Sequence, residues 1–148
     1  MKIQLNPSEM IGAAMVGVMR HTQNVKLGLG ATFGERPELA WQRHIEGALT
    51  EAALAKCLGR YWLGTGRWKD PDVGDVDVRA THRPNGRLII HKEDPEDRRF
   101  YFMTGLNGSY ELRGWIVGRD AKRVEWWTDP VGGRPAYFVP IEALNKIT

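Results

Sequence analysis

The first part of the chain places its hydrophobic side chains at the spacing of amphipathic helices. Asn6 followed by Pro7 is a helix-start signal, because asparagine caps helices and proline fits the first helical position. The pattern predicts a helix from Pro7 to about Thr22, with a face of small residues suited to close packing: Ala13, Ala14, Val16 and Gly17. A second helix is predicted to begin near Pro37 and to end at Gly59, since glycine commonly terminates helices.

After this second helix and a loop, the pattern changes to the two-residue alternation of β-strands. Valines at 76 and 78 alternate with Asp77 and Arg79, which predicts a half-buried strand with its valines toward the core. A turn at residues 84–86 leads into the next strand, so a hairpin is expected here. Further strands are predicted at residues 87–91, 99–104, 110–117, 123–127 and 136–139, and a short helix at 141–146.

Two helices followed by a run of strands are typical of a mixed α/β or α+β protein. The chain has 148 residues, which fits one domain of ordinary size. We therefore predict a single domain over residues 1–148, with N-terminal helices packed on a central mixed or largely antiparallel sheet.

The composition excludes several kinds of site but does not identify a function. A single cysteine excludes an intrachain disulfide and a cysteine-cluster zinc site, and the four histidines lack paired metal-ligand spacing. The longest apolar run, Met10 to Met19, is about half of the ~20 residues that a membrane span needs. We therefore expect a cytoplasmic protein without a membrane partner. The net charge of +3 permits a polyanion as partner but does not require one.

Glu51 stands out in the second helix. A helical wheel places it within the apolar stripe formed by Leu54, Ala55 and Leu58, so its carboxylate faces the rest of the fold. A buried carboxylate is costly unless it is paired, hydrogen-bonded or bound to a metal. The pattern therefore leaves two interpretations: a structural salt bridge to an arginine of the sheet, or a metal ligand.

Four carboxylates lie close together in the sequence before and within the first predicted strand, at positions 70, 72, 75 and 77. Mg²⁺ prefers hard oxygen ligands, and Asp72 and Asp77 with the backbone carbonyl of Val78 would supply them. The polar face of the strand is then either a cation-binding cleft or a solvent-exposed edge with scattered charges.

Glu51 on a helix, Asp72 after a proline, and the triplet of Asp77, Val78 and Arg79 together resemble the PD-(D/E)XK nuclease superfamily. The resemblance implies a restriction-endonuclease-like fold and hydrolysis of DNA phosphodiester bonds. It also implies that Glu51, Asp72 and Asp77 are catalytic and bind Mg²⁺ or Mn²⁺. Arg79 stands where the superfamily usually has lysine, and would stabilise the phosphate or orient water by its permanent charge.

Basic residues flank these positions in the sequence, and basic residues interleaved with aromatics suit contact with nucleic acid. The candidate DNA contacts are Arg67, Lys69, Arg87, His91 and Lys92. The size suits a phage-encoded or accessory endonuclease, and cutting both strands favours a homodimer. Two alternatives stay open: a non-catalytic module of the same fold that binds nucleic acid or protein, and a structural protein whose acidic hairpin is only surface.

Overall fold

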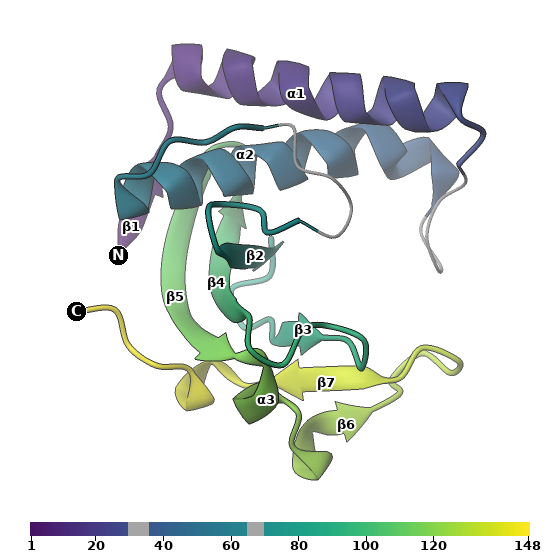
Figure 1. The fold of residues 1–148 in the computed structure, drawn as a ribbon, viewed down its shortest axis with the longest axis vertical. Coiled ribbons are helices and arrows are strands. Elements are labelled where there is room, and N and C mark those ends of the chain that lie inside the picture. Colours follow the sequence, from purple (N-terminus) through teal and green to yellow (C-terminus); the bar gives the residue numbers. More distant parts are fainter. Residues whose placement is uncertain (30–35, 65–69) are drawn as a thin grey trace.

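The computed structural model describes residues 1–29, 36–64 and 70–148, and its elements are mixed α and β (Figure 1). The helices are α1 (Pro7–Lys26), α2 (Ala40–Leu58) and the short α3 (Gly118–Ala121). The strands are β1 (Lys2–Gln4), β2 (Val76–Thr81), β3 (Leu88–Ile90), β4 (Arg99–Leu106), β5 (Ser109–Val117), β6 (Trp127–Thr128) and β7 (Ala136–Val139). Three single 3₁₀ turns lie at Pro37–Leu39, Val124–Trp126 and Ile141–Ala143.

The first helix begins and packs as its sequence predicts. Asn6 accepts a hydrogen bond from the backbone of Glu9, and the Glu9 side chain accepts one from the backbone of Asn6. The helix runs four residues beyond the predicted end at Thr22. At Gly17 the backbones of α1 and α2 touch, because an added Cβ would lie 2.5 Å from the Cα of Ile45. The two helices therefore pack so closely here that a side chain at position 17 would meet the backbone of α2.

The central sheet has four strands in the order β1, β5, β4, β2. Strand β2 runs parallel to β4, whereas the other pairs are antiparallel, so the sheet is mixed, as predicted. Helix α2 covers one face of this sheet and α1 lies on the far side of α2 (Figure 1). A second sheet, in the order β3, β7, β6, lies beyond the other face.

Three sequence predictions about the strands and the chain end were wrong. The expected hairpin does not form, because β3 pairs with β7 in the second sheet and not with β2. Residues 123–127 form mainly a 3₁₀ turn, and the predicted C-terminal helix is reduced to the turn at Ile141–Ala143. Strand β1, which pairs with β5, was not predicted.

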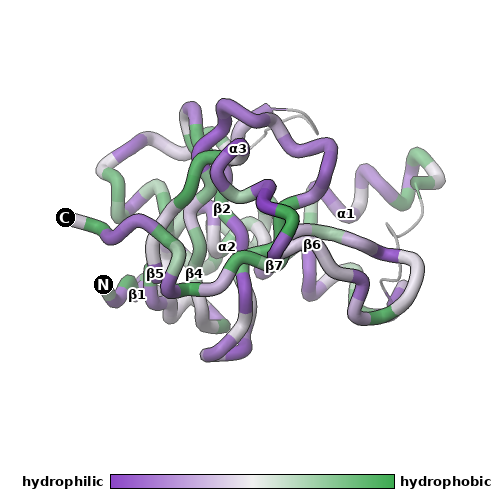
Figure 2. The backbone as a smooth tube through the Cα atoms, turned by 90° about the horizontal axis from the view of Figure 1, so that it is seen from below, coloured by the Kyte–Doolittle hydropathy of each residue, from purple (hydrophilic) through white to green (hydrophobic). Residues whose placement is uncertain are grey.

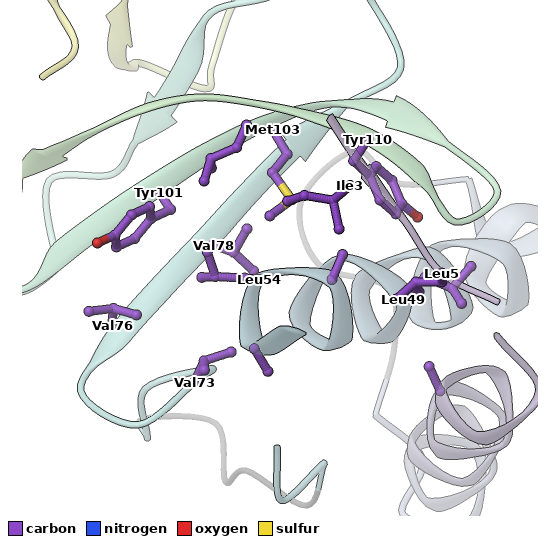
Figure 3. Close-up of a cluster of buried hydrophobic side chains, with 14 residues drawn as sticks. Ile3, Leu5, Leu49, Leu54, Val73, Val76, Val78, Tyr101, Met103 and Tyr110 are labelled. Carbon is purple, nitrogen blue, oxygen red and sulfur yellow. The ribbon is translucent and has the colours of Figure 1, made fainter. Parts of the chain in front are cut away.

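Alternation along β4 divides the core into two clusters. Tyr101 and Met103 pack with residues of α2 and with Val78 on the helix side, in the cluster drawn in Figure 3. Phe100 and Phe102 point the other way and pack with residues of the second sheet, in a separate buried cluster. Hydrophobic and hydrophilic stretches accordingly alternate along the backbone through helices and strands (Figure 2). The central sheet is thus covered on both faces.

The length and hydropathy of the described helices bear on the membrane prediction. Within residues 1–29, 36–64 and 70–148, no helix is both long and apolar enough to cross a bilayer.

Candidate functional site

Glu51 is buried, as the helical wheel predicts, and its partner is an arginine of the other helix. Arg20 of α1 donates from Nη1 to Oε1 of Glu51 at 2.8 Å and from Nη2 to Oε2 at 2.9 Å. The indole Nε1 of Trp62 donates to the same Oε2 at 3.1 Å. Only 8% of Glu51 is exposed. The hydrogen bonds to Glu51 raise the pKa of Arg20 above its ordinary value, so the guanidinium stays charged beside the carboxylate.

The close approach of the helices is what brings Arg20 to Glu51. Gly17 lies one turn before Arg20 on α1, and its missing side chain lets the two backbones meet. Arg20 also shares a helical face with Ala13, seven residues earlier, and that alanine is fully buried. Arg20 was not predicted as part of the site. A wheel of the first helix, drawn as for the second, would have shown one cation on its small-residue face.

The other two predicted site residues on β2 lie on the opposite face of the strand from its valines. Asp77 and Arg79 are register partners of Phe100 and Phe102, which pack toward the second sheet. Asp77 is buried and accepts from Nη1 of Arg98 at 3.0 Å.

Arg79, on the same face of β2, contacts Asp94 and Phe100. Its Nη2 donates to Oδ1 of Asp94 at 3.2 Å, and its guanidinium lies 5.1 Å from the centre of the Phe100 ring. Asp94 in turn caps its own turn by accepting from the backbone N–H of His91 at 2.7 Å. Asp94 and Arg98 are therefore parts of the cluster that the sequence did not place there.

Asp72 joins the two faces. Strand β2 is an edge strand of the central sheet, and Asp72 lies beside it. The Oδ2 of Asp72 accepts a hydrogen bond from the backbone N–H of Val78 at 2.9 Å. The backbone N–H of Asp72 donates to Oδ1 of Asp77 at 3.2 Å. Three carboxylates from α2, the segment before β2 and β2 itself thus act on one another across the edge of the sheet.

The burial of Asp72 and the nearby negative charges shift its pKa. Burial, the largest cause, and the negative charges of Glu51 and Asp77 together raise its pKa to about 7, against the lowering effects of the Val78 N–H and of Arg79. The fold therefore disfavours the ionised form of Asp72. An added positive charge nearby would favour its ionised form.

The donor set suits a hard divalent cation by its chemistry, but the oxygens are not arranged around one point. Among the described residues, no group of three or more carboxylate, histidine or cysteine side chains is placed to hold a metal ion. The reason is geometric: Glu51 lies with the helix layer, Asp77 lies on the opposite face of β2, and each has an arginine partner.

The predicted DNA contacts are scattered. The side chains of Arg87, His91 and Lys92 are exposed, on the segments around β3. Arg67 and Lys69 lie outside the described residues. The structure thus leaves three predicted basic groups available to a ligand and brings none of them into the carboxylate cluster.

Comparisons with known proteins add no relative to this picture. No family model matches the chain, and neither a curated protein nor a solved structure is significantly similar to it. Function must therefore be argued from the residues themselves.

Proposed function

We propose that this protein is a metal-dependent DNA endonuclease with a restriction-endonuclease-like fold. The observation that carries the proposal is that the buried Asp72 lies within the electrostatic influence of both Glu51 and Asp77, which lie toward opposite faces of β2. Burying three carboxylates close together is expensive unless they are paired, hydrogen-bonded or bound to a cation. Arginines balance two of them, and the raised pKa of Asp72 leaves the third unbalanced.

In this proposal Asp72 is the central ligand for Mg²⁺ or Mn²⁺, with Glu51 and Asp77 as the flanking ligands. The cation would neutralise phosphate charge and lower the pKa of a bound water. Arg79, whose side chain is about one-third exposed, would contact the phosphate as a fixed cation. The exposed Arg87, His91 and Lys92 would bind the DNA backbone, and a homodimer would cut both strands.

A second candidate, a non-catalytic module of the same fold that binds nucleic acid or protein, is favoured by one specific observation. Glu51 and Asp77 already have guanidinium partners, so most of the cluster's charge is balanced without a metal. In that case the carboxylates and arginines would serve stability, and Arg79 in place of lysine would mark the loss of catalysis.

Nicking of supercoiled plasmid in Mg²⁺, Mn²⁺ or EDTA, together with Mn²⁺ binding by calorimetry, separates the two candidates. We expect wild type to nick in a metal-dependent way, and Asp72→Asn to lose both nicking and Mn²⁺ binding. Asp75→Asn is the matched control, because Asp75 is three residues away but exposed, and pairs with Arg60. No nicking and no Mn²⁺ binding by wild type would refute the nuclease and leave the binding module.

A further inference from the structure

Helix α1 forms the outermost layer of the molecule, and its outward face is apolar (Figure 1). Ile11 is 67% exposed, and Met15, one turn further along the same face, is 62% exposed. Surface helices of globular proteins usually turn polar or charged residues outward. Between Glu9 and Lys26 the helix has one permanently charged residue, Arg20, and that side chain is paired with a carboxylate of α2. The outward face between these two positions is therefore without a permanent charge that would hydrate it.

An apolar hollow of about 520 Å³ lies beside this face, between α1, α2 and the turn that joins β4 to β5. Ile11 and Leu106, which is 50% exposed, both line it. The other apolar residues of the lining are Met10, Ala14, Ile45 and Leu49. An exposed apolar surface that continues into a hollow is typical of an interaction site, because covering it removes hydrophobic area from water.

The charged side chain in the lining of the hollow already has its hydrogen bonds. Glu46 accepts from the backbone N–H of Asn107 at 2.8 Å and from the hydroxyl of Tyr110 at 2.7 Å. A partner that covers the hollow leaves both hydrogen bonds in place, which reduces the cost of removing this carboxylate from water. Among the described residues that line the hollow, none is a lysine or arginine, so the surface does not suit a polyanion.

We propose that a second copy of this chain covers the outward face of α1 and the hollow, in a symmetric homodimer. Exposed apolar side chains and an apolar hollow lie side by side on one surface, so a two-fold axis can bring Ile11 of each copy over the hollow of the other. The scarcity of charge favours self-association, because like charges on two identical surfaces would repel. This inference rests on the proposed function in one respect, since it locates the homodimer named there.

Sedimentation equilibrium of the full chain over a range of concentrations tests the interface. We expect wild type to dimerise and Ile11→Glu to weaken dimerisation at least about 100-fold, because each dimer would then bury two carboxylates in apolar hollows. Met15→Glu should weaken it as well, and this variant decides if Ile11→Glu does not fold. Val124→Glu is the matched control and should leave the dimer unchanged, because Val124 is 89% exposed but precedes β6, on the opposite side of the molecule from α1 (Figure 1).

Two results would overturn the second copy as the occupant. One is a wild type that stays monomeric up to about 100 µM. The other is a dimer that neither Ile11→Glu nor Met15→Glu weakens. Flotation with phosphatidylcholine vesicles tests a bilayer as the other occupant: a monomeric wild type that floats with the vesicles would assign the surface to a membrane.

Plasmid cleavage by the same samples separates this inference from the nuclease. We expect Ile11→Glu to keep metal-dependent nicking but to lose most of the linear product, since cutting both strands at one place needs two sites. A dimeric wild type without metal-dependent nicking supports the interface and refutes the nuclease. Metal-dependent nicking by a monomeric wild type refutes the interface and leaves the nuclease.

Discussion

A buried carboxylate lies toward each face of strand β2, and the two carboxylates accept hydrogen bonds from different kinds of donor. On the helix side, Glu51 receives three hydrogen bonds, two of them from one guanidinium on another helix. On the side of the second sheet, Asp77 receives one from Arg98 and one from the backbone of Asp72. Both carboxylates are similarly buried, yet Glu51 is hydrogen-bonded to the neighbouring helix, whereas Asp77 is hydrogen-bonded to Arg98 before β4 and to the segment before β2. The difference predicts that the stability of the fold depends more on Glu51 than on Asp77.

Removing each charge in turn should produce the largest effect and test this comparison directly. We expect Glu51→Gln to cost about 2–3 kcal/mol of unfolding free energy, because Arg20 then stays partly buried without its counter-charge. Asp77→Asn should cost only about 1–2 kcal/mol, since a single arginine contact is weakened. Urea denaturation in EDTA measures both, and equal losses would show that the two faces are energetically equivalent.

The contact between the helices can be broken without touching a charge. Gly17→Ala should cost about 1–3 kcal/mol, because the new Cβ meets the backbone of α2 and forces the helices apart. Gly12→Ala is the matched control, as an added Cβ there has nothing within 4 Å. It should stabilise α1 by up to about 1 kcal/mol through helix propensity. Thermal unfolding of both variants gives the comparison, and a Gly17→Ala protein as stable as wild type would contradict it.

Several elements of the fold could be predicted from the sequence, because each depends on a local signal. The capping box of α1, the glycine that ends α2 and the alternation of β2 all depend on residues close together in the chain. The wheel placed Glu51 inward and the alternation placed Asp77 opposite the valines, and both are buried as charged groups rarely are. Local periodicity thus identifies which face a side chain takes.

The sequence did not predict which elements pack against those faces, since such contacts join residues far apart in the chain. Alternation showed that Asp77 points away from the valines, but not that the second sheet covers that face. The same alternation also argues against a metal site shared by Glu51 and Asp77. If the valines of β2 pack under α2, then Asp77 faces away from the helix that carries Glu51. Within the described part of the chain, Asp72 at the edge of the sheet interacts with both Glu51 and Asp77.

The pH dependence of stability isolates that connection. Below about pH 4 Asp72 is protonated in both states, and above about pH 7 it is ionised in both, because folding raises its pKa from 3.8 to about 7. Between these limits the folded protein keeps a proton that the unfolded chain has lost. The Asp72 contribution therefore falls as pH rises, by at most about 1.4 kcal/mol per pH unit.

Asp72→Asn removes this titration while its amide oxygen still accepts from the Val78 N–H. In metal-free buffer, the variant should gain stability relative to wild type between pH 4.5 and pH 6.5. Urea denaturation of both proteins at the two pH values measures the change. A difference that stays constant across this range would mean that Asp72 is ionised throughout and that its neighbours do not disfavour the charge.

The smallest expected effect concerns Arg79, whose pair with Asp94 lies on the face of β2 turned away from α2. Arg79→Lys keeps the charge but loses the planar group over Phe100 and the directed contact with Asp94. Both partners retain some exposure to solvent, so we expect a loss of only about 0.5–1 kcal/mol in urea denaturation. A loss as large as that of Glu51→Gln would place the structural centre of the cluster on the side of the second sheet. The helix pair of Arg20 and Glu51 would then be the more dispensable half, which would reverse the order of the two faces.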